Sequence, residues 1–188
     1  METVHIKING TSYEVAAGST ILEAAHSVGI EIPTLCYLKE INAIGACRIC
    51  VVEVKGAKSL VTACVYPVSE GMEVVTNSEK VMASRKTNLE LLLSTHDQNC
   101  LSCVRSTDCE LQRLCRDYGV NGQRFVGTRE RYALDDSAPH MIRDNNKCIL
   151  CRRCVAACRE NQAVGVIGPT ERGFQTHIAC AFEAKLGE

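Results

Sequence analysis

The sequence contains no long apolar run and almost no excess of charge of either sign. A membrane-spanning helix needs about eighteen or more consecutive apolar residues, and no such stretch occurs, so we expect no direct membrane insertion. The first residues, METVHIKING, lack the regions of a signal peptide, and we expect a cytoplasmic protein. Lys and Arg number 21 against 22 Asp and Glu, which argues against nucleic acid as a partner.

The usual signatures of a substrate-converting site are also missing. No G-x-G-x-x-G follows an expected strand, which argues against a dinucleotide-binding fold, and no Ser-His-Asp or paired-carboxylate arrangement is signalled. We therefore expect no catalytic residue and no substrate-converting site within these 188 residues.

Cysteine, in contrast, is abundant. The chain has 13 cysteines, and in a reducing cytosol clustered C-x2-C spacing points to metal and not to a disulfide framework. Apart from Cys180, they fall into three groups. The groups are Cys36, Cys47, Cys50 and Cys64; then Cys100, Cys103, Cys109 and Cys115; then Cys148, Cys151, Cys154 and Cys158. Three groups suggest three metal sites in three consecutive modules.

Residues 1–77 are expected to form a β-grasp 2Fe-2S ferredoxin-like domain. VHIKINGTSYEV alternates apolar and polar residues on both sides of Asn9 and Gly10, which favours a β-hairpin because a type I′ turn needs positive φ at both central positions. STILEAAHSVGI has helix-capping residues and one apolar face, and it predicts a short helix. The runs ICVVEVKG, SLVTACVYPV and GMEVVTN follow as strands. The elements thus follow the order of a β-grasp ferredoxin: two strands, a helix, a cysteine loop and further strands.

The first cysteine group predicts a 2Fe-2S cluster. Its ligands are Cys36, Cys47, Cys50 and Cys64, spaced C-x10-C-x2-C-x13-C. Gly45 and Ala46 are small, so the backbone can approach a cluster and point N–H groups at its sulfurs. Plant-type ferredoxins have only about four residues between the first two cysteines. The gap of ten resembles the 2Fe-2S domain of the large iron–sulfur subunit of complex I and of iron-only hydrogenases. Buried free thiols and a structural zinc site are the alternatives.

Residues 78–120 are expected to form a small helical domain that binds a 4Fe-4S cluster. NSEKVMASRKTNLELLLS has helical periodicity with Asn77 or Ser78 as the N-cap, and its apolar stripe is expected to be core. That stripe is Val81, Met82, Leu89, Leu91, Leu92 and Leu93. A second helix, ELQRLCRDYG, would place Leu111 and Leu114 inward and keep Cys115 as a core thiol that binds no metal.

One histidine and three cysteines lie between these two helices. The expected ligands are His96, Cys100, Cys103 and Cys109, spaced H-x3-C-x2-C-x5-C. This spacing resembles the histidine-ligated 4Fe-4S cluster of complex I, iron-only hydrogenases and several formate dehydrogenases. A neutral imidazole in place of a thiolate makes the site less negative and should favour the reduced state. A Cys3His zinc site needs the same four ligands and is the alternative.

Residues 121–188 are expected to contain a linker and half of a bacterial-ferredoxin-like domain. Cys148, Cys151 and Cys154 begin the run C-x2-C-x2-C-x3-C, in which the first three thiolates hold one 4Fe-4S cluster and the fourth reaches a different one. Two features depart from that pattern: Arg159 replaces the usual proline, and no second run follows in the sequence. The fourth ligand is therefore left open among Cys180, Cys158 and a cysteine outside the chain.

Over nearly its whole length the chain resembles the N-terminal iron–sulfur arm of NAD(P)-linked iron-only hydrogenases. The stretches IPTLCYL, GACRICVVEV, DQNCLSCVRSTDCELQRL and RDNNKCILCRRCVAAC carry this resemblance. The complex I large subunit and NAD-linked formate dehydrogenases have the same module order. The resemblance implies one 2Fe-2S and two 4Fe-4S clusters in an electron-transfer module of a hetero-oligomer. Its partners would be a flavin/iron–sulfur subunit that oxidises NAD(P)H and a catalytic domain, in this family a hydrogenase.

Two other classes of protein use clustered cysteines. A zinc-structured interaction module would use the thiols for folding energy, but a nucleic-acid-binding module would carry a basic face. Only the stretch around Arg143, Lys147, Arg152 and Arg153 is basic. A thiol–disulfide protein would need one exposed reactive pair and not three runs. Both alternatives predict a colourless protein, whereas iron–sulfur clusters predict a coloured one.

Overall fold

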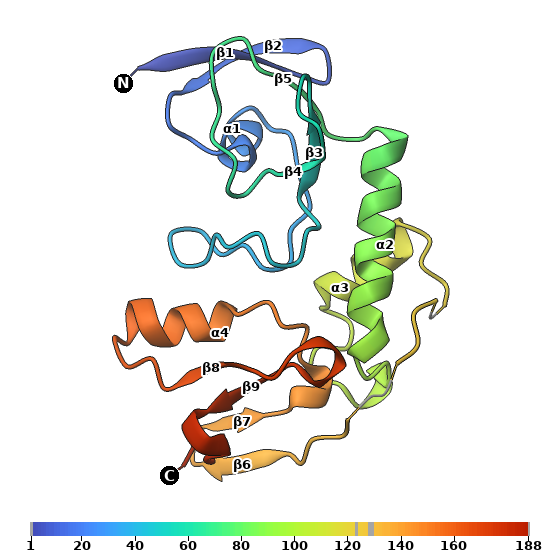
Figure 1. Ribbon diagram of the computed structural model, residues 1–188, viewed down its shortest axis with the longest axis vertical. Helices are drawn as coiled ribbons and strands as arrows, with labels where there is room; N and C mark the ends of the chain where they lie inside the picture. Colours follow the sequence, from blue (N-terminus) through green and yellow to red (C-terminus); the bar gives the residue numbers. More distant parts are fainter. Residues whose placement is uncertain (1, 123, 128–129, 188) are drawn as a thin grey trace.

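The computed structural model describes residues 2–122, 124–127 and 130–187. Figure 1 shows a β-sheet at one end of the molecule, two small hairpins at the other, and a long helix that runs along one side. The loop between α1 and β3 extends from the sheet toward α4 in the C-terminal part. Helices and strands are separate segments, as the expected α+β class requires.

The N-terminal sheet has five strands in the order β2-β1-β5-β3-β4. They are β1 (Thr3–Ile8), β2 (Thr11–Ala16), β3 (Val51–Val54), β4 (Val61–Thr62) and β5 (Glu73–Val75). β1 pairs antiparallel with β2 and parallel with β5, which is the β-grasp arrangement expected from the sequence. Asn9 and Gly10 have φ of 53° and 86°, so the predicted hairpin turn is confirmed.

Helix α1 (Ile21–Ser27) packs on this sheet through an apolar face. Thr20 and Glu23 form the predicted capping box: the Thr20 side chain accepts from the Glu23 N–H, and the Glu23 carboxylate accepts from the Thr20 N–H at 2.9 Å. Gly29, with φ of 77°, follows the C-cap and ends the helix. Ile6, Ile8, Val15, Leu22, Val52 and Val74 form part of the buried core between helix and sheet.

Helix α2 (Glu79–Thr95) begins at the predicted cap, Ser78, but its buried face differs from the predicted stripe. Val81 and Leu89 are fully buried, as expected, whereas Met82 and Leu91 are 40% and 47% exposed, so the prediction for these two was wrong. Residues four apart share a helix face, and here Arg85 lies between Val81 and Leu89 and is only 3% exposed. The spacing of apolar residues alone does not reveal this buried face, because the residue at its centre, Arg85, is charged.

Arg85 connects three elements. Its Nη2 donates to the Val51 carbonyl of β3 at 2.8 Å, and its Nη1 donates to the Tyr118 hydroxyl at 3.0 Å, just beyond α3 (Glu110–Asp117). We expect Arg85→Ala to lower the free energy of unfolding by roughly 2–4 kcal/mol, because it leaves a buried carbonyl unsatisfied and opens a cavity. Urea unfolding would measure this. Tyr118→Phe, which removes only one acceptor, should cost about 1 kcal/mol. Equal costs for the two variants would contradict this role of Arg85.

The C-terminal part consists of two antiparallel hairpins and short helical turns. Its strands are β6 (Asp135–Ala138), β7 (Met141–Arg143), β8 (Ile167–Thr170) and β9 (His177–Cys180). Its helical turns are η2 (Asn145–Lys147), α4 (Arg153–Ala156), the π-helical η3 (Ala157–Asn161), η4 (Gly173–Gln175) and η5 (Ala181–Glu183). In the described ranges, no helix has the length and apolar character needed to cross a membrane.

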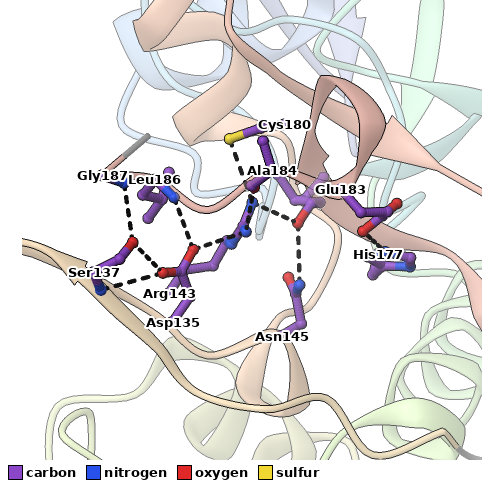
Figure 2. A network of polar contacts seen from close by, with 11 residues as sticks. Asp135, Ser137, Arg143, Asn145, His177, Cys180, Glu183, Ala184, Leu186 and Gly187 are labelled. Carbon is purple, nitrogen blue, oxygen red and sulfur yellow. Dashed lines mark hydrogen bonds and ion pairs between the residues drawn. The ribbon is translucent and has the colours of Figure 1, made fainter.

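Polar contacts hold the end of the chain against the β6–β7 hairpin (Figure 2). The Arg143 guanidinium pairs with the Asp135 carboxylate at 2.8 Å and donates to the Ala184 carbonyl at 3.5 Å. The Leu186 N–H donates to the same Asp135 carboxylate at 3.0 Å. Arg143 also donates to the Cys180 sulfur at 3.8 Å, so this thiol is part of the network.

Candidate metal centres

The first cysteine group is buried at the end of the sheet. Exposed fractions are 0% for Cys36, 8% for Cys47, 1% for Cys50 and 0% for Cys64. The Cys50 and Cys64 sulfurs lie 3.4 Å apart. All four thiols predicted for the 2Fe-2S site therefore lie inside the core, where water is excluded.

Backbone N–H groups point at these sulfurs. Cys36 accepts from the N–H of Ala46, and Cys64 accepts from the N–H of Gly45, as expected from the small residues at these positions. Gly45 has φ of 61°, and a Cβ here would lie 3.3 Å from the Thr62 hydroxyl, so both the backbone conformation and the space favour glycine. Arg48, between Cys47 and Cys50, also has positive φ, 55°, and so helps to bend the loop around the site.

Hydrogen bonds between the thiols make two of the four sulfurs more acidic. The hydrogen bond from Cys47 lowers the pKa of Cys36 to about 6, and the same bond raises the pKa of Cys47. The hydrogen bond from Cys50 likewise lowers the pKa of Cys64 and raises that of Cys50. Thiolates are the form that binds metal, and the hydrogen bond within each pair favours the thiolate at Cys36 and at Cys64.

The second group lies where α2 ends and α3 begins. His96 is the C-cap residue of α2, Cys100 begins the short turn η1 (Cys100–Ser102), and Cys109 is the N-cap residue of α3. The Arg105 N–H donates to the Cys103 sulfur at 3.4 Å. The two helices thus position the ends of the ligand loop, as the sequence predicts.

A cavity of about 640 Å³ lies beside this loop. His96, Cys103 and Cys109 line it, together with Cys151 of the third group. Among the described residues, Cys100 is the predicted ligand of this group that does not line the cavity. The structure therefore brings two of the three cysteine groups to one space.

These donors suit an iron–sulfur cluster in chemical type. Thiolates with one imidazole are the ligands that such clusters use. Within residues 2–122, 124–127 and 130–187, no three His, Cys, Asp or Glu side chains converge closely enough to hold a single metal ion. A cluster needs wider spacing, because several iron and sulfide atoms lie between its ligands.

The third group begins in the loop before α4 and continues into the helical segments: Cys154 lies in α4 and Cys158 in η3. Leu150 and Arg152 have φ of 55° and 58°, so the loop between Cys148 and Cys154 contains two residues in the left-handed region. The Leu150 N–H donates to the Cys148 sulfur at 3.3 Å. Burial raises the pKa of Cys148 to about 11 and raises the pKa of Cys154 as well.

The two candidates for a fourth ligand within the chain have different surroundings. Cys158 accepts backbone hydrogen bonds from Val166, Gly165 and Ile167, and these lower its pKa. Cys180 is at the end of β9 beside the Arg143 guanidinium, as Figure 2 shows. Both sulfurs therefore have hydrogen-bond donors beside them.

Lys147 holds the third group against the second. Its Nζ pairs with the Asp97 carboxylate at 3.0 Å and donates to the Asn99 carbonyl at 2.8 Å. Lys147 is adjacent to Cys148, while Asp97 and Asn99 lie beside His96 and Cys100. Of the basic stretch noted in the sequence, at least Lys147 and Arg143 therefore serve internal contacts.

Family models match two parts of the chain. A 2Fe-2S iron-sulfur cluster binding domain matches residues 1–79, and the NADH-ubiquinone oxidoreductase-G iron-sulfur binding region matches residues 85–124. A 2Fe-2S-binding domain is thus followed by a 4Fe-4S-binding region.

Individual proteins are similar over almost the whole chain. NADP-reducing hydrogenase subunit HndD of Solidesulfovibrio fructosivorans is 42% identical over 100% of this chain and 33% of its own length. The NADH-ubiquinone oxidoreductase 75 kDa subunit of Reclinomonas americana is 36% identical over 94% of this chain and 26% of its own length. The chain therefore spans a third or less of these curated relatives.

A solved structure is similar over most of both chains. A crystal structure of NAD+-reducing [NiFe]-hydrogenase in the H2-reduced state matches with a TM-score of 0.89 and 32% identity, over 98% of this chain and 78% of that one. Together with the buried thiols and the histidine-containing ligand loop, this likeness identifies the family. The chain belongs to the iron–sulfur chains that NAD(P)-linked hydrogenases share with complex I-like oxidoreductases.

Proposed function

We propose that the chain carries electrons between a flavin/iron–sulfur subunit that oxidises NAD(P)H and a catalytic hydrogenase domain. One observation carries this proposal: cysteines of all three groups pack in one hydrophobic core. Cys36 and Cys47 of the first group are buried there, and Cys109 and Cys151 of the second and third groups pack against that core. The shared core holds the three groups near one another, as electron transfer between the proposed centres requires.

The proposed cofactors are one 2Fe-2S and two 4Fe-4S clusters, which when bound supply one-electron redox chemistry. The first would be held by Cys36, Cys47, Cys50 and Cys64, and the second by His96, Cys100, Cys103 and Cys109. The third would be held by Cys148, Cys151 and Cys154, with Cys180, Cys158 or a residue outside the chain as fourth ligand. The protein's own part is to exclude water, donate N–H groups to sulfurs and hold the sites at constant distances.

The partners follow from the named relatives. The NADP-reducing and NAD+-reducing hydrogenases favour a hetero-oligomer with a nicotinamide-oxidising subunit on one side. We propose the cytoplasm as its location. We propose an iron-only hydrogenase as the other partner, following the resemblance of the cysteine motifs. The second candidate is a complex I-like dehydrogenase, which the similarity to the NADH-ubiquinone oxidoreductase 75 kDa subunit favours, or a formate dehydrogenase with the same module order.

Metal and sulfide analysis of anaerobically purified protein tests the proposal. We expect about ten irons per chain with matching sulfide, and EPR signals of one 2Fe-2S and two 4Fe-4S centres after dithionite reduction. About six irons would keep the electron-transfer function but place the last ligand elsewhere. Zinc without sulfide would disprove the proposal in favour of a zinc-structured interaction module.

The variant Cys180→Ala tests the fourth ligand of the third site. If Cys180 binds iron, the variant should lose up to about four irons, and the EPR signal of one 4Fe-4S centre should disappear. Cys158→Ala is the matched variant. Unchanged iron in Cys180→Ala and loss in Cys158→Ala would assign the ligand to Cys158, and no change in either would assign it to a group outside the chain.

A further inference from the structure

The long gap between Cys36 and Cys47 contains a tight turn. The Leu38 N–H donates to the Asn42 carbonyl at 2.9 Å, and the Asn42 N–H donates back to the Leu38 carbonyl at 2.8 Å. Glu40, inside the turn, has φ of 63°. The turn directs the Asn42 side chain inward, where the residue is only 2% exposed. A buried amide group needs hydrogen-bond partners.

The Asn42 amide nitrogen has two partners, one in each of two cysteine groups. Nδ2 donates to the Cys36 carbonyl at 2.7 Å and to the Cys151 carbonyl at 3.0 Å. Both partners are acceptors, so the amide nitrogen and not its oxygen must face them. Its two N–H groups thus hold together a proposed ligand of the first centre and one of the third, which lies 109 positions from Asn42 in sequence.

A second side chain reinforces the same contact. Arg153 Nη2 donates to the Tyr37 carbonyl at 2.9 Å, and Arg153 Nη1 pairs with Glu110 at 3.6 Å. Tyr37 follows Cys36 in sequence, and Arg153 precedes Cys154. The interface between the first and third groups therefore includes polar contacts to residues at or next to the proposed ligands, in addition to its apolar packing.

We propose that Asn42 is a positioning residue that sets the distance between the first and third metal centres and links them by hydrogen bonds. This inference rests on the proposed function, because it requires both clusters. Electron-transfer rates fall steeply with separation, so a residue that fixes the separation controls the rate. Asn42 contacts the ligand residues through backbone carbonyls and not through their sulfurs, so its replacement should leave each centre able to bind its cluster.

The variant Asn42→Leu tests the proposal, because leucine has the same branching at Cγ and no donor. Asn88→Leu is the matched control: the Asn88 amide donates to the Arg48 carbonyl, beside Cys47, at 2.9 Å. After iron and sulfide analysis, EPR would measure the spin–spin interaction between the reduced first and third centres. Rapid photoreduction would measure the rate of electron exchange between them. Asn42→Leu should weaken the interaction and slow the exchange several-fold, and Asn88→Leu should change neither.

Two further results decide the outcome. Asn42→Gln keeps both donors and should recover part of the interaction, which a loss of packing alone would not explain. If Asn42→Leu does not fold, Asn42→Ala provides the same test, because alanine is smaller and also has no donor. The inference would be overturned if a folded variant without the Asn42 donors keeps all its clusters and also keeps the wild-type spin–spin interaction and the wild-type rate of electron exchange. If the wild-type protein itself is found to bind no iron–sulfur clusters, the proposed function is overturned, and this inference falls with it.

Discussion

Replacement of Cys50 by alanine is expected to remove the first metal centre. Cys50 is 1% exposed and lies 3.4 Å from the Cys64 sulfur, so no other thiol can take its place without a rearrangement of the core. About two irons and two sulfides per chain should be lost, along with the 2Fe-2S EPR signal. Because metal binding stabilises the folded state, the midpoint of thermal unfolding should fall as well.

Cys115→Ala is the matched control for this prediction. Cys115 lies in α3 and packs against the same hydrophobic core as Cys36 and Cys47, and burial raises its pKa to about 11. It is expected to bind no metal, so the variant should keep all its iron. Loss of iron in Cys115→Ala, or full iron in Cys50→Ala, would show that the ligands are wrongly assigned.

His96→Cys is expected to keep a 4Fe-4S centre and to lower its reduction potential. A fourth thiolate adds one negative charge to the site and so disfavours the reduced state. Two histidine ligands raise the potential of Rieske centres by several hundred millivolts, so we expect a decrease on the order of 100 mV. An EPR-monitored redox titration would measure it.

The exposed His26, in the last turn of α1, provides the control. His26→Gln should leave the potentials of all centres unchanged. If His96→Cys also leaves them unchanged while its iron content is full, His96 is not a ligand. Loss of the 4Fe-4S centre would instead show that the site cannot accept a thiolate at position 96. The variant would then have no reduction potential to compare with that of the wild type.

Local structure could be predicted from the sequence wherever neighbouring residues determine it. The Asn9-Gly10 turn, the Thr20–Glu23 capping box and the Ser78 cap depend on bonds within a few residues, and all are present. The buried face of α2 was predicted only in part. Arg85 is buried where its Nη1 and Nη2 atoms donate to the Tyr118 hydroxyl and the Val51 carbonyl, and these partners are distant in sequence.

The sequence alone determines the type and spacing of the proposed metal ligands. These two properties were enough to indicate the family and the number of expected metal sites. Cysteine and histidine are the natural iron–sulfur ligands, and their spacing within one loop is a local property. Only the tertiary structure decided how the three groups meet. Asn42, Lys147 and Arg153 join loops that are far apart in sequence, and a short-range pattern carries no signal for such pairs. The physical reason is that a buried polar group binds whichever partner the folded chain brings within about 3 Å.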